Sequence, residues 1–411
     1  MKILMVNKFL YPRGGSESYM LSLGECFTRM GHQVEYFGMY DEKNTVGNSA
    51  GKYTQNMDFH STGWSRFLYP FRILYSEDSK RKIGEVLDRF QPDIVHMNNI
   101  NFQLTPSIIY AIKKRNIPLV QTVHDFQMIC PNHLLYNFQK NEPCEKCTRG
   151  SQFSCMKNRC IHGSLVKSIL GFLEAKLYGF LKTYKKVDLY ICPSHFLEEK
   201  LCSSKSFYRG KTYTIHNFIN KQQFLKTSDK VEPYILFVGR LFREKGVQFL
   251  KETAKLLPQY TFLVAGNGPD EEILADIPNL KRLGFLTGEK LTEVMGNAKL
   301  LLLPSVCYEN CPLSILEAHS MGVPVVTMNY GGMAELVEDG VTGTLAEEAT
   351  PEGIAKAIQK TMRDEGYYQT LKKNCETIKD QIYSVEDYCN NLLEKYRSIT
   401  GGGEPNGGCE G

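Results

Sequence analysis

Two glutamates frame one loop and one predicted helix in the last third of the 411-residue chain. Glu309 stands just before this helix and Glu317 lies two turns into it, because the helix opens near Cys311-Pro312. The first N–H groups of a helix have no partner within it and carry a partial positive charge, so they favour a phosphate. The spacing predicts a phosphate seat, with Glu317 placed to reach ribose hydroxyls and Glu309 facing a reacting sugar.

Two cations lie together on an earlier loop. Arg240 and Lys245 belong to the stretch that follows an apolar strand predicted at residues 235–238. Arginine and lysine side chains can clamp a diphosphate leaving group. The alternative for both is a salt bridge on a solvated surface, and the two glutamates favour the clamp.

The first half of the chain carries polar residues at predicted turns and strand ends. Gly14-Gly15 separates the first strand from the first helix, where the backbone either approaches a ligand or simply turns tightly. The three-glycine dinucleotide fingerprint is absent. His96, Asn98 and His124 lie at or after predicted strand ends, which is where open α/β sheets place their sites. All three are candidates for the site, and a core histidine is the alternative for His124.

Five cysteines crowd into about thirty residues of the first half, at Cys130, Cys144, Cys147, Cys155 and Cys160. Four thiolates in two such pairs can hold a tetrahedral zinc ion in a closed, structural site. We predict structural zinc at Cys144, Cys147, Cys155 and Cys160, which would order a cysteine-rich insertion at residues 130–162. Unpaired thiols in a loop are the alternative, and Cys130 is expected to be a core residue.

The elements that would position these residues alternate strand and helix along the chain. Such alternation predicts parallel sheets with helices on both faces, the doubly wound α/β class. The alternation restarts near Tyr234, and the length also suits two domains. We divide the chain into a first domain at 1–190, a second at 191–383, a terminal helix at 384–400 and a glycine-rich, disordered tail at 401–411.

Composition is ordinary for a soluble globular protein, with 42% hydrophobic and 23% charged residues. No apolar run approaches the roughly 20 residues that span a bilayer, and the amino terminus lacks the core of a signal peptide. We therefore expect a cytoplasmic protein in which the 13 cysteines are thiols, metal ligands or catalysts rather than disulfides. No nucleic-acid partner is expected.

Charge is spread unevenly over the chain. Residues 1–190 hold 25 Lys+Arg against 16 Asp+Glu, a net +9, whereas residues 191–411 hold 24 against 29, a net −5, which together give +4. A basic first half suits an anionic surface or acceptor, and solvated helix faces are an equally good alternative. The aromatic stretch within 41–76 and the lysine-rich helix at 163–186 are expected either to pack on the sheet or to touch an anionic membrane surface.

Four separated motifs follow one another in the second half. They are Gly239-Arg240 with Lys245-Gly246, Ala265-Gly266-Asn267-Gly268-Pro269, Glu309 with seven residues to Glu317-Ala318, and Gly322-Val323-Pro324-Val325-Val326. In this order they resemble family 4 of the retaining glycosyltransferases, over nearly the whole chain. The resemblance implies the GT-B fold, in which two Rossmann-like domains face a cleft and a terminal crossover helix packs back on the first domain.

The resemblance also implies a division of labour between the domains. The second domain would bind a nucleotide-diphosphate sugar and the first an acceptor. Arg240 and Lys245 would stabilise the diphosphate, and Glu317 would hold the ribose. Glu309 would contact the transferred sugar near its 3- and 4-hydroxyls.

Further donor contacts are implied in both domains. His124 would contact the donor sugar, and Gly14-Gly15 would close over the donor. The remaining donor-binding positions would be Asn310, Cys311, Pro312 and Leu313. The backbone amides of residues 311–313 would contact the sugar or the phosphates. The family is thought to retain configuration by same-face attack with a diphosphate oxygen as base, so neither His124 nor Glu309 need be a nucleophile. No Asp-x-Asp pair stands near the cleft in the second domain, so catalysis is expected to need no metal or other cofactor.

Asn310-Cys311-Pro312 departs from the commonest family pattern, which has glycine and an aromatic residue at these positions. The sequence therefore does not identify the donor sugar. We expect transfer to a glycan or lipid-linked acceptor in cell-surface polysaccharide synthesis, at the inner face of the cytoplasmic membrane. The alternative enzyme is a nucleotide-sugar 2-epimerase, for which His96 and His124 are available. A zinc-organised binding protein with a silent catalytic domain is a third possibility, against which the intact Arg, Lys and Glu residues argue.

Overall fold

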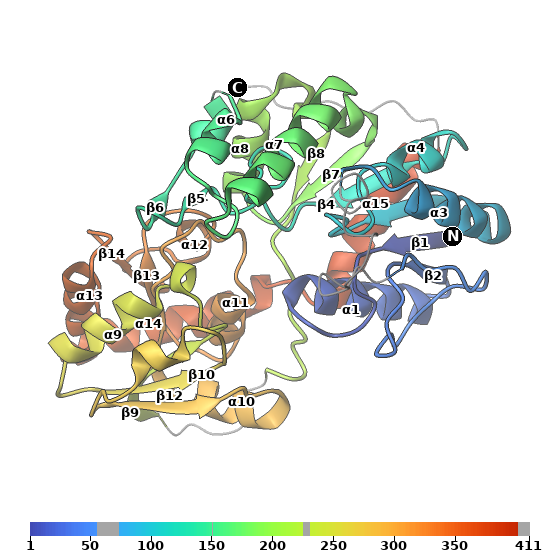
Figure 1. The fold of residues 1–411 in the computed structure, drawn as a ribbon. Helices are drawn as coiled ribbons and strands as arrows, with labels where there is room; N and C mark the ends of the chain where they lie inside the picture. Colours follow the sequence, from blue (N-terminus) through green and yellow to red (C-terminus); the bar gives the residue numbers. More distant parts are fainter. Residues whose placement is uncertain (56–73, 150, 225–230, 402–411) are drawn as a thin grey trace.

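The computed structural model describes residues 1–55, 74–149, 151–224 and 231–401. Most of the predicted aromatic stretch and the predicted tail beyond residue 401 lie outside these ranges. The described chain forms two domains, each built on one parallel six-stranded sheet (Figure 1). Among the described helices, none combines the length and the apolar character needed to cross a membrane.

The first sheet has the strand order β2-β1-β3-β4-β7-β8. Its central strands, β1, β3, β4 and β7, are buried, as expected for a parallel sheet covered on both faces, whereas the edge strands β2 and β8 are partly exposed. Their bounds are β1 Lys2–Val6, β2 Gln33–Phe37, β3 Ile94–Met97, β4 Leu119–Thr122, β7 Leu189–Cys192 and β8 Thr212–Thr214. Because β3 and β4 are parallel neighbours, the residues that follow them meet at one edge of the sheet.

Helices cover both faces of this sheet, and serine caps mark where several begin. Ser76 accepts a hydrogen bond from Ser79 N–H before α3, and Ser194 accepts one from Leu197 N–H before α8. The helices are α1 Gly15–Arg29, α3 Glu77–Phe90, α4 Ile108–Lys113, α7 Leu165–Phe180 and α8 His195–Ser204. The helix predicted at 163–186 is interrupted, because Lys182 adopts a left-handed conformation with φ of 51° before a short 3-10 turn, η1 Thr183–Lys186.

The predicted domain boundary after residue 190 is too early. It cuts through β7, and β8 pairs with β7 in parallel, so the first sheet runs on to Thr214. Strand β8 is only three residues long and half-buried, which left it with a weak apolar signal. The crossing to the second domain therefore lies after β8.

The cysteine-rich insertion lies between β4 and α7. It contains a two-stranded antiparallel hairpin and two short helices rather than an extension of the main sheet. These elements are β5 Tyr136–Asn137, β6 Glu142–Pro143, α5 Lys146–Arg149 and α6 Phe153–Lys157. The insertion faces the second domain near α12 in Figure 1.

The second sheet has the order β11-β10-β9-β12-β13-β14 and is again parallel. Its strands are β9 Glu232–Val238, β10 Thr261–Ala265, β11 Leu280–Gly284, β12 Ala298–Leu303, β13 Val325–Met328 and β14 Gly343–Ala346. Its helices are α9 Val247–Leu256, α10 Gly288–Gly296, α11 Leu313–Ser320, α12 Met333–Leu336, α13 Pro351–Arg363 and α14 Glu365–Ile378. Since β9 and β12 pair directly, the loops that follow them share one edge.

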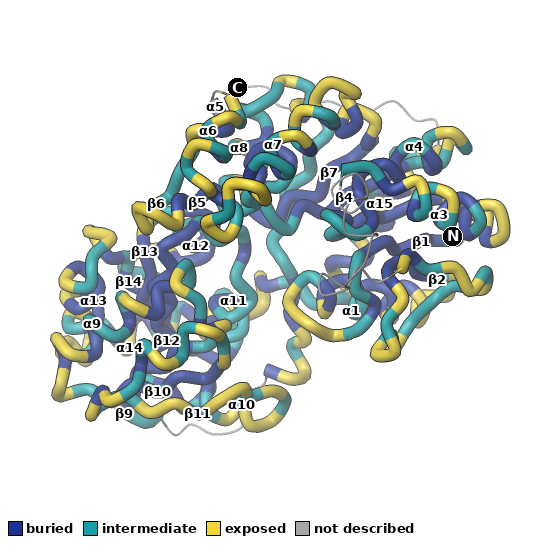
Figure 2. The backbone as a smooth tube through the Cα atoms, viewed as in Figure 1, coloured by how far each residue is buried: buried dark blue, intermediate teal, exposed yellow. Residues whose placement is uncertain are grey.

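The buried residues form separate cores in the two domains. Figure 2 shows most of the strands as buried segments within each domain, with exposed helix faces and loops around them. The first sheet has a cluster on each face, and the second domain has a large cluster of its own. Each domain therefore has the core it needs to hold its loops in place.

The last helix, α15 (Val385–Thr400), returns the end of the chain to the first domain. Beside it, Ile219 N–H donates to the carbonyl oxygen of Tyr383 at 3.2 Å, so the two crossings between the domains run together. The buried face of α15 joins the first-domain core through Tyr388, Cys389, Leu392, Leu393 and Tyr396. The predicted crossover helix is thus present.

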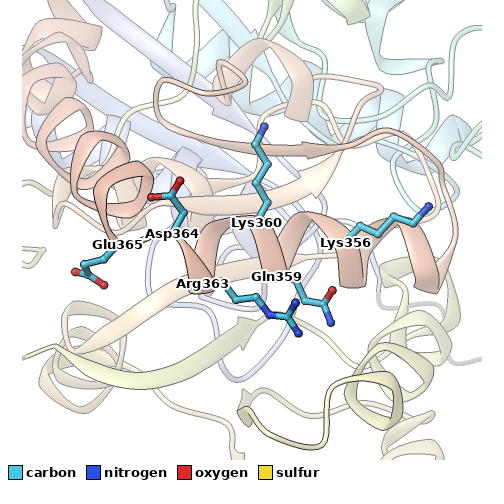
Figure 3. Close-up of a pocket in the computed structure, with 6 residues that line it drawn as sticks. All are labelled: Lys356, Gln359, Lys360, Arg363, Asp364 and Glu365. Atoms are coloured by element: carbon cyan, nitrogen blue, oxygen red, sulfur yellow. The ribbon is translucent and has the colours of Figure 1, made fainter.

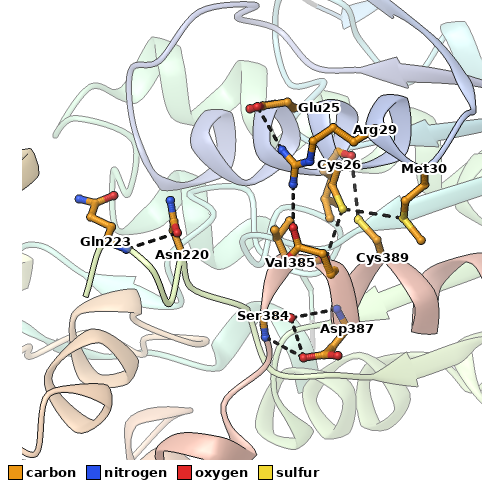
Figure 4. Close-up of polar contacts among 12 residues, drawn as sticks. Glu25, Cys26, Arg29, Met30, Asn220, Gln223, Ser384, Val385, Asp387 and Cys389 are labelled. Atoms are coloured by element: carbon orange, nitrogen blue, oxygen red, sulfur yellow. Dashed lines mark hydrogen bonds and ion pairs between the residues drawn. The ribbon is translucent and has the colours of Figure 1, made fainter. Parts of the chain in front are cut away.

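Figure 4 shows the start of α15 against α1. Arg29 Nη2 pairs with Glu386 Oε1 at 2.7 Å. Ser384 and Asp387 cap the helix reciprocally, because the Ser384 hydroxyl accepts from Asp387 N–H at 3.1 Å and the Asp387 carboxylate accepts from Ser384 N–H at 3.3 Å. This cap fixes where the chain turns from the second domain onto the first.

Candidate active site

An ion pair with little exposure lies at the carboxyl edge of the second sheet. Lys245 Nζ donates to Glu309 Oε1 at 2.5 Å, and Ser305 Oγ donates to the same oxygen at 2.7 Å. The two side chains are 25% and 12% exposed. Burial lowers the pKa of Lys245 and raises that of Glu309, but their mutual attraction outweighs burial, so the pKa of Lys245 is raised and that of Glu309 lowered. Both groups are charged at neutral pH.

The loop that carries Lys245 lies against the backbone at the end of β12. Gly246 has φ of 80°, and a Cβ there would lie 1.8 Å from the carbonyl oxygen of Pro304. Only glycine fits that approach. Val306 N–H donates to the carbonyl oxygen of Glu244 at 3.0 Å. The close contact of the two loops is what brings lysine and glutamate together.

A third loop supports Glu309 from behind. Gly332 N–H donates to the carbonyl oxygen of Glu309 at 2.7 Å, and a Cβ on Gly332 would lie 1.6 Å from the carbonyl oxygen of Asn310. Tyr330 Oη donates to the carbonyl oxygen of Ser305 at 2.7 Å. Only the paired glycines mark this loop in the sequence, and Ser305, Tyr330 and Gly332 were not predicted as supports.

Arg240 lies in the loop after β9, exposed, with its guanidinium 4.9 Å from the ring centre of Phe242. Its positive charge acts on both members of the ion pair, since it lowers the pKa of Glu309 and that of Lys245. Arg240 is therefore a third charged group, next to the Lys245–Glu309 ion pair. Because its side chain is exposed, it is open to a ligand that carries negative charge.

Glu317 lies in α11, on the helix that begins directly after Pro312. Burial raises the pKa of Glu317 to about 7. Such a carboxyl group gains by accepting hydrogen bonds from ligand hydroxyls, because these favour its charged form. Glu317 is thus suited to hold a diol such as a ribose.

The amino terminus of α11 offers fewer amides than predicted. Pro312 has no N–H and cannot donate to a phosphate; it stands at the N-cap with φ of −67°. Cys311 is buried, with its Sγ accepting from Asn217 N–H at 3.3 Å and its carbonyl oxygen from Asn217 Nδ2 at 3.0 Å. Leu313 begins the helix and is half-buried. Cys311 therefore fastens α11 to the crossing between the domains.

His124 approaches from the first domain. Its Nε2 lies within hydrogen-bond distance of Asn98 Oδ1, at 2.9 Å, and burial lowers the pKa of His124 to about 4. Asn310 Nδ2 of the second domain donates to the carbonyl oxygen of His124 at 2.9 Å. A neutral histidine of one domain thus lies beside the residue that follows Glu309 in the other.

His96, also a candidate, is a core residue. Its Nδ1 lies 2.5 Å from Tyr396 Oη and its Nε2 lies 2.7 Å from Thr122 Oγ1, and burial lowers the pKa of His96 to about 3. It joins the sheet to the crossover helix.

Gly14 and Gly15 lie at the start of α1, with Gly14 at the N-cap in extended backbone. A Cβ on Gly15 would meet no atom within 4 Å, so this position borders open space. Asn99 Nδ2, at the end of β3, donates to Ser16 Oγ at 2.9 Å. The glycine turn therefore shares an edge of the first sheet with Asn98 and His124.

The cysteine-rich insertion contacts the loop that carries Glu309. Tyr308 Oη donates to Glu145 Oε1 at 3.0 Å, and Lys200 Nζ pairs with the same carboxylate oxygen at 2.7 Å. Tyr136 packs with Val306 and Cys307 in a small buried cluster. Glu145 stands inside the predicted zinc motif, Cys144-Glu145-Lys146-Cys147, and its contact with the site was not predicted.

The predicted zinc ligands gather around one small cavity. Cys144, Cys147, Cys155 and Cys160 line it together with Cys130. Within residues 1–55, 74–149, 151–224 and 231–401, however, no three or more His, Cys, Asp or Glu side chains are arranged as metal ligands. The thiols are therefore close together without forming a tetrahedral site, and structural zinc stays a prediction.

A larger hollow, of about 650 Å³, lies elsewhere on the second domain (Figure 3). Its residues come only from α13 and the start of α14, and they include Lys356, Lys360 and Arg363. None of the predicted site residues lines it. This hollow is therefore a depression on the surface of α13 and is not part of the candidate active site.

Comparison with known families matches both domains. The profile described as Glycosyltransferase Family 4 matches residues 13–223, just over half of the chain, and that described as Glycosyl transferases group 1 matches residues 232–364. An uncharacterised glycosyltransferase of Methanocaldococcus jannaschii is 24% identical over 427 residues, which cover 97% of this chain and 98% of that protein.

Solved structures share the fold at low identity. Sucrose-phosphate synthase from Thermosynechococcus elongatus matches with a TM-score of 0.70 at 17% identity, over 97% of this chain and 98% of its own. Anabaena HepE in complex with UDP matches with a TM-score of 0.68 at 19% identity, over 97% of this chain and 100% of its own, and it has also been solved with UDP-glucose. These matches confirm the predicted GT-B fold class.

Proposed function

Since the chain belongs to glycosyltransferase family 4 and is a glycosyltransferase, we propose that it moves a hexose from a nucleotide-diphosphate sugar to a glycan or lipid-linked acceptor, with retention of configuration. The proposed donor is a uridine nucleotide sugar, because structures of the same fold have been solved with UDP and with UDP-glucose. The reaction would serve cell-surface polysaccharide synthesis in the cytoplasm, at the inner face of the membrane.

The observation that carries the proposal is the Lys245–Glu309 ion pair, together with the exposed cation Arg240 next to it. A diphosphate gains charge as it leaves a sugar, and cations held close by stabilise that charge in the transition state. Glu309 holds Lys245 in place and also has oxygen atoms for sugar hydroxyls. Glu317 would accept hydrogen bonds from the ribose of the same donor.

The proposed reaction takes place on one face of the sugar. The bond between the anomeric carbon and the phosphate oxygen breaks, and its electron pair leaves with the diphosphate. The acceptor oxygen bonds to the anomeric carbon on the same face and passes its proton to the leaving phosphate oxygen. His124 is neutral, so its role would be to contact the donor sugar rather than to supply charge.

The 2-epimerase alternative is not favoured by the family matches, which are to glycosyltransferases throughout the two domains. An epimerase would alter the nucleotide sugar without any acceptor. A silent binding protein would bind donor without releasing nucleotide. Both alternatives give results distinct from transfer.

The test begins with a thermal-shift screen of UDP- and GDP-sugars, since a true donor raises the melting temperature by mass action. Release of UDP from the donor that stabilises the protein is then followed with and without candidate acceptors, and NMR of the product gives its anomeric configuration. Transfer is expected to depend on acceptor and to keep the donor's configuration. An inverted product, or a changed nucleotide sugar without acceptor, would contradict the proposal.

A further inference from the structure

Helix α7 presents its apolar side to solvent. Six of the eleven large hydrophobic residues that are exposed among the described residues fall between Phe153 and Leu181. On α7 and the residue after it they form what we name the α7 face, made of Leu165, Val166, Leu173, Phe180 and Leu181. Val166 is 67% exposed and Phe180 85%. An apolar patch concentrated in this way marks a binding surface more often than scattered single residues do.

The inner side of the same helix is small or polar. The buried residues of α7 are Ser168, Gly171, Glu174 and Tyr178. The apolar stripe of a helix in a globular protein normally faces the core. In α7 the buried side is not the apolar one, so packing on the first domain does not account for the exposed Leu165, Leu173 and Phe180.

The segment that carries the α7 face is positively charged. Between residues 151 and 187 the chain has one acid, Glu174, and it is buried. The cations of this segment are all exposed, and among the described residues none of them takes part in an ion pair; they are Lys157, Arg159, Lys167, Lys176, Lys182, Lys185 and Lys186. Exposed apolar side chains bordered by unpaired lysines are the features of helices that lie in the plane of an anionic membrane.

We propose that the α7 face docks the first domain onto an anionic lipid bilayer. The 16-residue helix, about 24 Å long, would lie along the surface with Leu173 and Phe180 below the headgroups. The flanking lysines would meet the anionic headgroups, where each adds to the attraction. This attachment does not depend on the transfer reaction.

A second copy of the chain fits the α7 face less well. Lys176 lies on the exposed side of α7, and the same segment carries six more exposed cations, so two copies face to face would oppose like charges. A bilayer offers anionic headgroups next to an apolar interior, and it thus matches both features of the surface at once.

The experiment is sedimentation of the full chain with vesicles of phosphatidylglycerol and phosphatidylcholine, compared with vesicles of phosphatidylcholine alone. We expect binding to the anionic vesicles, and weaker binding as salt rises. A variant with Leu173→Glu and Phe180→Glu is expected to bind at least about tenfold more weakly. Phe285→Glu is the matched control, since Phe285 is 69% exposed in the second domain and should leave binding unchanged.

Charge is tested separately with Lys176→Glu and Lys185→Glu together, expected to weaken binding about tenfold, against Lys281→Glu and Lys290→Glu in the second domain. Melting temperatures of all variants confirm folding. Absence of wild-type binding to anionic vesicles, or undiminished binding of the Leu173→Glu, Phe180→Glu protein, would overturn the proposal. Self-association in ultracentrifugation that this variant abolishes, with no vesicle binding, would overturn it in favour of a second copy. If the variants release UDP at the wild-type rate, their loss of vesicle binding is independent of the proposed catalysis.

Discussion

At the scale of single residues, the proposed reaction depends most on the ion pair between Lys245 and Glu309. Both residues follow strands of the second sheet, β9 and β12, which pair directly. Sequence reasoning could place the two residues at one edge because carboxyl ends of neighbouring parallel strands meet there. It could not find Ser305 or Tyr330, since their roles depend on how three loops fold over one another.

We expect Glu309→Gln to lower kcat about 10²–10³-fold, because Lys245 then loses its charged partner and the sugar loses an acceptor. Lys245→Met should have a similar effect, and the double variant should lose less than the two single effects added together. The measurement is product formation at saturating donor. Lys255→Met, which removes an exposed pair with Glu252, is the control and should be unchanged. Full activity in Glu309→Gln would remove this residue from the site.

Glu317 gives the site a pH dependence. Its raised pKa means that the folded protein binds a proton more tightly than the unfolded chain, whose glutamate pKa is about 4.3. The stability that this proton contributes is therefore lost as pH rises from about 4.3 to about 7. A ribose needs the ionised carboxylate, so affinity for UDP should rise about tenfold between pH 6 and pH 8.

The check is UDP affinity by calorimetry across that pH range, with Glu317→Gln as control. The control retains the titration of UDP itself and lacks that of Glu317. A pH profile identical in the two proteins would show that Glu317 does not touch the ligand.

At the scale of elements, regular strands and helices could be predicted and local irregularities could not. Buried strands can be predicted because they are apolar runs in the sequence. Strand β8 is short and half-buried, so its place in the first sheet could be assigned only from the structure. Lys182 turns left-handed after α7, and no glycine marks that turn in the sequence. The insertion could be recognised by its cysteines, but its contact with the loop that carries Glu309 arises only when the two domains meet.

The contact between Glu145 and Tyr308 should position the loop that carries Glu309. Glu145→Gln would weaken the hydrogen bond from Tyr308 and remove the ion pair with Lys200. We expect KM for the donor to rise about tenfold, with a smaller change in kcat. Glu145→Asp should restore part of the loss. Glu142→Gln, a surface acid on β6, is the control, and equal kinetics in the Glu142 and Glu145 variants would exclude a positioning role.

Metal content tests the thiol cluster. Purified protein handled under reducing conditions should contain close to one equivalent of zinc, and Cys147→Ser should lose it and lower the melting temperature. Zinc is measured by atomic emission. Less than about half an equivalent in the wild type would leave the cluster as a set of buried thiols.

At the scale of the whole molecule, the two domains are joined by polar contacts as well as by the chain. Glu335 of α12 accepts hydrogen bonds from the N–H groups of His195, at 2.8 Å, and Phe196, which begin α8 of the first domain. A carboxylate at a helix amino terminus is favourable. This contact and that of Asn310 with His124 hold the two halves of the site in register, and neither could be inferred within one domain.

The crossover helix depends on a buried polar contact with the first sheet. Tyr396→Phe would leave His96 Nδ1 without its partner, and we expect the free energy of unfolding to fall by about 1–3 kcal/mol. Urea unfolding measures it. Tyr213→Phe removes a hydroxyl 3.3 Å from Asn391 at a half-buried position and should cost less than about 0.5 kcal/mol. Equal losses in the two variants would show that the buried contact adds nothing.

The return of α15 to the first domain also sets the order in which the protein can be completed during synthesis. The ribosome makes the first sheet early, yet the helix that covers α1 is among the last segments to emerge. Until then Tyr19, Leu23 and Phe27, buried in the finished fold, have no α15 to pack against. The second domain can fold in the interval, so the domain that begins first is finished last. A chain released before residue 385 would expose an apolar face that promotes aggregation. Loss of the carboxyl end would therefore destabilise the first domain rather than the second.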